Sequence, residues 1–260
     1  MNDHTNLDTD DGQRFIEGDG TPDADWQAWG GLAALPLLDV AALVPPGARA
    51  VIVAPHPDDE MLGCGGLLQA LAAQRSRTLL VAVTDGAASH PGSPLWPPHR
   101  LACARPLETG HALDVLGLAG TQVIRARLPD GDVAAHAPQL QTMLQQLLRP
   151  GDVVFATWRL DGHPDHEASG HAAALAARAC RATLVELPIW SWHWAAPGDV
   201  RIPWRRARRL VLSSERLRRK RDAIHCYHSQ LRADPSTGRP SVLPPTVLER
   251  LLHPYEIYFL

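Results

Sequence analysis

Short apolar strand-like runs alternate with helix-like segments along most of this 260-residue chain. In the first of them, residues 51–54 are four apolar, largely β-branched residues in a row, which suits a strand of a sheet that is covered on both faces. The runs lie at 50–55, 78–86, 121–128, 152–158 and 183–190. This alternation predicts an α/β fold, a Rossmann-like three-layer sandwich with a mostly parallel central sheet and helices on both faces.

The composition changes near residue 25. Residues 1–25 are polar and acidic, and such a segment buries too little apolar surface to order itself. We therefore expect residues 1–25 to form a disordered acidic tail. The remainder carries most of the apolar residues, which make up 45% of the whole chain, and we expect residues 26–260 to form a single domain.

Charge and cysteine usage restrict the class of partner. The chain has 25 Lys and Arg against 28 Asp and Glu, a net charge of -3, which gives no general attraction to nucleic acid or to an anionic membrane. No stretch approaches the roughly 18 apolar residues of a membrane span, and no secretory leader pattern is present. The four cysteines are widely spaced without a CxxC pair. These features predict a cytoplasmic protein with reduced thiols that acts on a small molecule.

The last third of the chain is less regular. Residues 208–213 predict a strand and residues 214–231 a helix, and the Trp-rich stretch before them predicts a loop. Trp190, Trp192 and Trp194 would share one face of an extended segment. Such a stripe is more typical of a core or an interface than of a platform for a sugar ring.

Two polar motifs follow two of the predicted strands. HPDDE (56–60) comes directly after the first strand, and HPDH (163–166) follows the fourth. In the common strand order of such sheets, strands 1 and 4 are neighbours where the order reverses, and ligands bind at their carboxyl ends. The motifs would then share one pocket, with Pro57 and Pro164 stiffening the turns. Histidines and carboxylates in this number suit a catalytic zinc site, although Fe(II), Co(II) or Ni(II) would also be accepted.

The motifs also carry a resemblance to a known family. PHPDDEMLGCGG followed by HPDH resembles the LmbE-like, or PIG-L, family of zinc-dependent N-deacetylases, which remove acetyl groups from N-acetylglucosamine-type sugars. The similarity extends to four shorter segments, TDGA (84–87), RPLE (105–108), LPDG (128–131) and KRDAIHCYHSQ (220–230). It implies a metal-dependent hydrolase with one Zn²⁺ per chain that deacetylates an N-acetylated amino sugar or glycoconjugate.

The resemblance further implies roles for the motif residues. His56, Asp59 and His166 would bind zinc, which polarises the amide carbonyl and activates water. Asp58 would be the general base that accepts the water proton and returns it to the leaving amine. His163 would stabilise the tetrahedral oxyanion.

Three further residues receive roles in the same way. Asp165 would orient one of the metal ligands. Arg105 and Asp130 lie where the family contacts the sugar. The sugar or conjugate itself is not fixed by these motifs.

Alternative functions stay open at this point. An amidase of the same chemistry could act on a bulkier thiol or glycoconjugate. A non-catalytic carbohydrate-binding relative is a second class, but Asp58 argues against it because a binding protein needs no general base. A nucleotide-dependent enzyme is a third, since Gly63, Gly65 and Gly66 resemble a dinucleotide fingerprint. However, these glycines follow the strand too late, and close packing of a helix on the sheet explains them equally well.

Other polar or aromatic residues have both a functional and a structural interpretation. The basic clusters at 205–209 and 216–221 could contact a substrate phosphate, but a solvated face is more typical. Glu256 could return to the site or could bind a backbone or Arg partner. His90 and Trp96 lie in a loop that could cover the pocket or remain an ordinary exposed loop.

Overall fold

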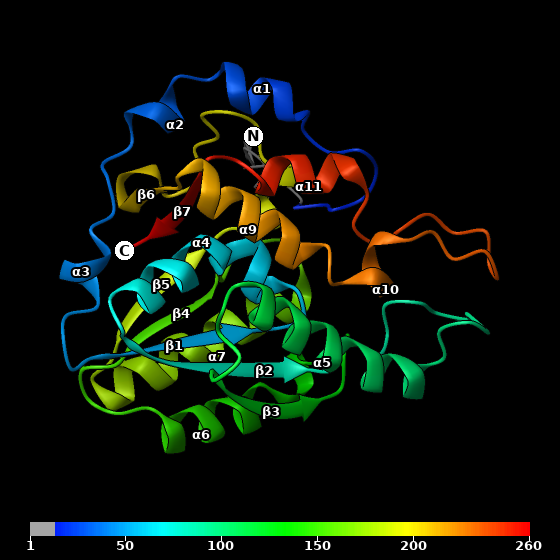
Figure 1. The fold of residues 1–260 in the computed structure, drawn as a ribbon, viewed down its shortest axis with the longest axis horizontal. Coiled ribbons are helices and arrows are strands. Elements are labelled where there is room, and N and C mark those ends of the chain that lie inside the picture. Colours follow the sequence, from blue (N-terminus) through cyan, green and yellow to red (C-terminus); the bar gives the residue numbers. More distant parts are fainter. Residues whose placement is uncertain (1–13) are drawn as a thin grey trace, which may run out of the picture.

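The computed structural model describes residues 14–260, which form an α/β fold around one seven-stranded sheet (Figure 1). The strand order is β3-β2-β1-β4-β5-β7-β6, with β1 to β5 parallel and β7 antiparallel to both β5 and β6. The strands are β1 Arg49–Ala54, β2 Arg77–Thr84, β3 Gln122–Leu128, β4 Val153–Thr157, β5 Thr183–Leu187, β6 Ala207–Val211 and β7 Tyr255–Phe259. The predicted fold class is confirmed.

The helices differ widely in length. The long ones are α4 Asp59–Ala73, α5 Pro98–Val115, α6 Ala137–Leu147, α7 Pro164–Cys180 and α9 Ser214–Ile224. The short ones are α1 Asp23–Ala28, α2 Gly31–Ala34, α3 Val40–Leu43, α8 Ser191–Trp194, α10 His228–Leu231 and α11 Pro245–Leu251, with 3-10 turns at Ala134–His136 and Trp204–Arg206. None of the helices between residues 14 and 260 combines the length and the hydropathy that crossing a bilayer requires.

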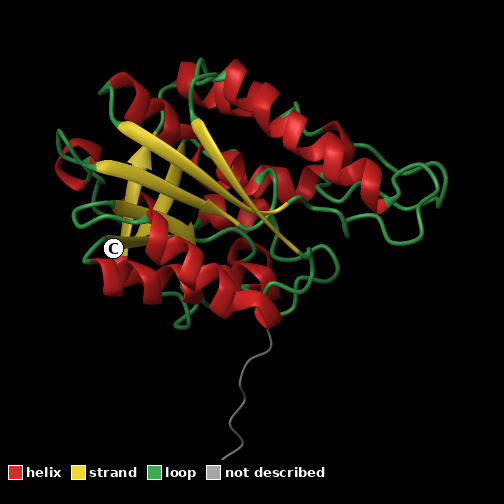
Figure 2. Ribbon diagram, turned by 90° about the horizontal axis from the view of Figure 1, so that it is seen from below, coloured by secondary structure: helices red, strands yellow, loops and turns green. Residues whose placement is uncertain are grey.

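Helices cover both faces of the sheet (Figure 2), and the sheet separates two hydrophobic cores. Side chains alternate along β1, so that Ile52 joins the core with α4, α5 and α9, whereas Val51 and Val53 join the core with α6 and α7. All three side chains are buried. Burial on both faces explains why β1 is continuously apolar rather than alternating.

The strand order places both polar motifs at one edge of the sheet. β1 pairs with β2 on one side and with β4 on the other, so the order reverses between β1 and β4. α4 begins at Asp59 within the first motif, and α7 begins at Pro164 within the second. The carboxyl ends of β1 and β4 therefore present the two motifs to the same crevice, as the sequence predicted.

The glycine-rich part of α4 faces side chains of other elements. A Cβ on Gly63 or Gly66 would collide with Leu187 or Leu212. These glycines lie inside the helix rather than at its start, where a pyrophosphate would bind. Close packing accounts for them, and the dinucleotide interpretation has no support here.

The Trp-rich stretch differs from the extended conformation considered above. Residues 191–194 form the short helix α8, so the three indoles do not share one face. Trp192 lies 5.0 Å from Trp26 between ring centroids, and Trp194 stacks on Trp158. The third, Trp190, lines a cavity described below.

Residues 14–25 of the expected tail make contacts with distant parts of the chain. Of the expected tail, residues 1–13 lie outside the described residues. Within the rest, Arg14 Nε lies 3.1 Å from Glu167 Oε1, and Thr21 Oγ1 donates to Ala195 O at 2.7 Å. These are polar contacts to distant elements, which the low apolar content of the segment did not reveal.

The junction between α7 and β4 gives a stability prediction. A Cβ on Gly170 of α7 would collide with the backbone carbonyl of Thr157. Gly170→Ala should therefore lower the free energy of unfolding by about 1–3 kcal/mol. Gly110 lies on α5, and a Cβ added there would meet nothing within 4 Å. Because Ala is the better helix former, Gly110→Ala should raise the free energy of unfolding by up to about 1 kcal/mol. Urea unfolding of both variants measures this, and equal stability of the two would contradict the packing described.

Candidate active site

A cavity of about 210 Å³ lies at the carboxyl ends of β1 and β4. It is lined by residues of both motifs and by residues of neighbouring loops and helices, and Ala88, Ser89, Gln230, Val242 and Leu243 contribute part of its wall. The motif residues and neighbours that face it are His56, Asp58, Asp59, Arg105, Asp130, His163 and Trp190. The two motifs thus meet in one pocket although about a hundred residues of sequence separate them.

The three predicted metal ligands lie next to one another. Asp59 Oδ2 is 3.3 Å from His56 Nδ1 and 3.2 Å from His166 Nε2. His166 is fully buried, and its Nε2 makes no hydrogen bond with any described residue, because its contact with Asp59 lacks hydrogen-bond geometry. The ring nitrogens of His56, His163 and His166 also lie within 4.8 Å of one another. Two imidazole nitrogens and a carboxylate oxygen, one nitrogen buried and unpartnered, fit the donor set of zinc.

A buried aspartate fixes the orientation of His166. His166 Nδ1 donates to Asp161 Oδ2 at 2.8 Å, which directs Nε2 toward Asp59. A bound metal would replace the proton on Nε2 and take its lone pair. Asp161 also accepts the backbone N–H groups of Ile189, Trp190 and Ser191. The sequence analysis assigned no role to Asp161. Its position two residues before HPDH was the available signal.

Two carboxylates lie behind His56. His56 Nε2 is 3.1 Å from Asp165 Oδ2 and 3.1 Å from Asp130 Oδ1, which leaves Nδ1 directed toward Asp59. Asp165 is held in turn by the N–H groups of Gly131 and Val133. Asp165 thus contacts one of the predicted metal ligands, and its orienting role stays a prediction.

The ionisation of this cluster favours positive charge beside Asp59. Burial alone would raise the pKa of Asp59, but His166 and His56 hold it below its usual value. Burial would likewise lower the pKa of His166, whereas Asp59 and Asp161 raise it to about 9. The carboxylates therefore create a site in which a cation is stabilised.

Asp58 differs from Asp59 in both backbone and environment. Its φ is 137°, a region that non-glycine residues rarely adopt, and it precedes the first residue of α4. Asp58 Oδ2 accepts a hydrogen bond from Arg105 Nη2 at 3.0 Å. Burial raises the pKa of Asp58 to about 7, although Arg105 acts in the opposite direction. The two adjacent aspartates thus point to different partners.

Arg105 is held tightly by the loops around it. Its side chain is only 3% exposed, and it donates to Gly86 O, Pro57 O and Asp58 Oδ2. These bonds orient Asp58. The substrate contact implied for Arg105 stays a prediction.

His163 presents a neutral imidazole to the cavity. Burial lowers its pKa to about 3, with His166 and His56 acting in the same direction. Its Nδ1 accepts the N–H of Asp165 at 3.2 Å, so Nε2 carries the ring proton. The ring stacks near Trp190 at 6.4 Å between centroids. His163 is therefore a hydrogen-bond donor in the wall of the cavity.

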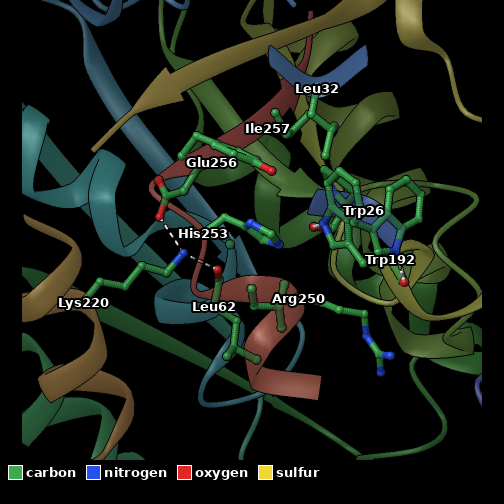
Figure 3. Close-up of a pocket in the computed structure, with 13 residues that line it drawn as sticks. Trp26, Leu32, Leu62, Trp192, Lys220, Arg250, His253, Glu256 and Ile257 are labelled. Atoms are coloured by element: carbon green, nitrogen blue, oxygen red, sulfur yellow. Dashed lines mark hydrogen bonds and ion pairs between the residues drawn. The ribbon is translucent and has the colours of Figure 1, made fainter. Parts of the chain in front are cut away.

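Glu256 is not among the residues that line this cavity. It accepts the N–H groups of Gly66 and Leu67. Its Oε1 also pairs with Lys220 Nζ at 2.8 Å (Figure 3). Its backbone partners agree with the second of the two interpretations above. Leu62 lines both the site cavity and the small pocket beside this ion pair.

The loop after β2 contributes only its first part to the cavity. Ala88 and Ser89 line the cavity, whereas Trp96 lies under Arg100, whose guanidinium carbon is 4.5 Å from the ring centroid. Ser93 Oγ is 3.2 Å from Ser236 Oγ, which joins this loop to the one at 232–244, and both loops project from the body (Figure 1). A covering role for His90 and Trp96 stays untested.

Comparison with known proteins agrees with this geometry. Residues 51–177 match the model of a family described as PIG-L: GlcNAc-PI de-N-acetylase, and the match contains both motifs. Residues 51–177 of the chain belong to the PIG-L/LmbE-like deacetylase family. This membership confirms the resemblance drawn from the motifs. The match ends before the Trp-rich stretch of this family member, which lies at 190–194.

Solved structures share the fold of this family member. A conserved protein from Thermus thermophilus is 29% identical, with a TM-score of 0.50 over 70% of this chain and 79% of that chain. N,N'-diacetylchitobiose deacetylase from Pyrococcus horikoshii, in complex with an inhibitor, is 18% identical, with a TM-score of 0.54 over 74% of each chain. The zinc-inhibited form of teicoplanin deacetylase Orf2 is 21% identical, with a TM-score of 0.56 over 71% of this chain and 85% of that chain. A search of curated proteins found no match.

Proposed function

We propose that this protein is a zinc-dependent N-deacetylase that hydrolyses the acetamido group of an N-acetylated amino sugar or glycoconjugate. The observation that carries the proposal is the buried, unpartnered Nε2 of His166 beside Asp59 and His56, at the edge of a cavity that Asp58 also lines. Metal ligands and a separate carboxylate in one pocket are what metal-assisted hydrolysis needs.

His56, Asp59 and His166 would hold the metal. A divalent cation bound there supplies Lewis acidity toward the amide carbonyl and lowers the pKa of water. Asp58 accepts the proton of the attacking water and delivers it to the leaving amine, while Arg105 keeps the carboxylate oriented. His163 donates from Nε2 to the amide oxygen as negative charge develops on it. The products are acetate and a free amine.

The cavity supports a sugar-sized substrate. A volume of about 210 Å³ can admit the ring of an amino sugar that carries the acetamido group. Its wall mixes apolar Trp190 and Leu243 with polar Ser89 and Asp130, a combination suited to the faces and hydroxyls of a sugar. The solved relatives named as chitobiose and teicoplanin deacetylases support the same substrate class.

The test is metal content, measured by inductively coupled plasma mass spectrometry, followed by acetate release. Wild type purified without chelators should contain about one zinc per chain, and His166→Ala should contain little. His171→Ala makes the same change at an exposed position of α7 and should retain the metal. Acetate release is then measured on N-acetylglucosamine, N,N'-diacetylchitobiose and a larger N-acetylated glycoconjugate. Wild type that takes up no zinc, or that releases no acetate from any of them, would rule out the proposal.

A further inference from the structure

The strained backbone at Asp58 is held by a buried carboxylate that the mechanism above does not use. We propose that Glu60, fixed by Tyr227 and Thr109, is a positioning residue for Asp58. This inference rests on the proposed function, because it assigns Asp58 the role of general base.

The contacts of Glu60 define the arrangement. Glu60 Oε2 accepts the backbone N–H of Asp58 at 3.0 Å. Glu60 Oε1 accepts hydrogen bonds from Tyr227 Oη at 2.6 Å and from Thr109 Oγ1 at 2.9 Å. Glu60 is 1% exposed and Tyr227 is fully buried, so no solvent competes for these bonds. One oxygen of the Glu60 carboxylate therefore binds the Asp58 backbone, and the other is bound by the two hydroxyl groups.

The backbone of Asp58 needs such a partner. A residue just before a helix has no helical acceptor for its N–H, and a buried N–H without a partner is costly. An L-residue at a φ of 137° persists only where the surrounding structure enforces it. Glu60 accepts the backbone N–H of Asp58, and Arg105 donates to the Asp58 carboxylate. Separate groups therefore fix the backbone and the side chain of Asp58.

The hydroxyl that holds Glu60 comes from a distant part of the chain. Tyr227 lies between α9 and α10. The start of α10 is bound to α5 through Glu108, which accepts hydrogen bonds from the backbone N–H of Ser229 at 2.8 Å and from its hydroxyl at 2.7 Å. Thr109, which follows Glu108 on α5, supplies the second hydroxyl. The position of Asp58 thus depends on the packing of α5 and α9 against α4. Loss of the Tyr227 hydroxyl should allow the Glu60 carboxylate to move. Asp58, the proposed general base, would then leave the position in which it can accept the water proton.

The decisive variant is Tyr227→Phe, with Tyr258→Phe as the matched control. Tyr258 is equally buried and its hydroxyl also donates to a carboxylate, that of Glu256, but none of its bonds reaches Asp58. We expect Tyr227→Phe to lower kcat by about 10- to 100-fold, with KM within about twofold and zinc content unchanged. Tyr258→Phe should keep kcat within about twofold of the wild-type value, even if it lowers the melting temperature as much as Tyr227→Phe does. Equal kcat values of the two variants would overturn the proposal.

Two further measurements separate this inference from the proposed function. Hydrogen exchange of the Asp58 amide, followed by NMR, should be about tenfold faster in Tyr227→Phe than in wild type or Tyr258→Phe, and unchanged exchange would overturn the inference whatever the activity. Glu60→Gln keeps an acceptor for the Asp58 N–H and should retain more kcat than Glu60→Met, which has none. Wild type that releases no acetate would rule out the proposed function. The exchange rate of the Asp58 amide would still decide whether Glu60 holds Asp58.

Discussion

Asp58→Asn is expected to keep about one zinc per chain and to lose kcat for acetate release by about 10²- to 10⁴-fold. The amide of Asn cannot accept a proton from water at neutral pH, but its oxygen can still accept the hydrogen bond that Arg105 donates to Asp58 Oδ2 at 3.0 Å. The neighbouring Asp59, which lies between His56 and His166, is unchanged. Metal analysis and steady-state kinetics on the same preparation measure both quantities.

A matched control is Asp85→Asn. Asp85 also pairs with an arginine, Arg125, at 2.6 Å, and it does not line the site cavity. It should keep kcat near that of wild type. Full activity of Asp58→Asn would remove the general-base assignment, and loss of zinc from it would instead make Asp58 a metal ligand.

The convergence of the two motifs could be predicted because it depends on strand order alone. Once the first and fourth strands are neighbours at the reversal, His56 and His166 must lie at the same edge of the sheet. The residues that support the site could not be found in the same way. Asp161 binds backbone N–H groups of residues 189–191, and Glu60 binds a hydroxyl 167 positions away, so their nearness to the motifs does not show what either of them binds.

The same distinction explains the errors in the Trp-rich stretch and at the end of the chain. Aromatic residues favour strands, but the buried Asp161 carboxylate binds the backbone before α8, and Trp192 packs on Trp26, so tertiary contacts select a helical turn. β7 was not predicted from the sequence, and it adds the antiparallel part of the sheet by pairing with β5 and β6. Lys220 lies in a basic cluster typical of a solvated face, yet its side chain is 1% exposed.

That buried lysine gives the prediction with the largest expected effect on stability. Lys220 Nζ donates to Leu62 O at 2.7 Å and lies 2.8 Å from Glu256 Oε1, while Glu256 accepts the N–H of Gly66 at 2.7 Å. Leu62 O and Gly66 N–H are the two groups that an undistorted α-helix would join to each other. The ion pair therefore takes part in the hydrogen bonding of α4, the helix that begins at Asp59.

Lys220→Met should lower the free energy of unfolding by about 3–5 kcal/mol, because it leaves the Glu256 charge buried without its counter-ion. The double variant Lys220→Met/Glu256→Gln removes that charge as well and should be more stable than Lys220→Met by at least about 1 kcal/mol. Arg218→Met breaks an ion pair on the same helix, α9, where the arginine is 57% exposed, and the unfolding midpoint should not move. Urea unfolding of the three variants provides the measurement. If Lys220→Met unfolds at the wild-type midpoint, the pair contributes nothing to α4. If the double variant is no more stable than Lys220→Met, the loss comes from the missing hydrogen bond to Leu62 and not from an unpaired charge.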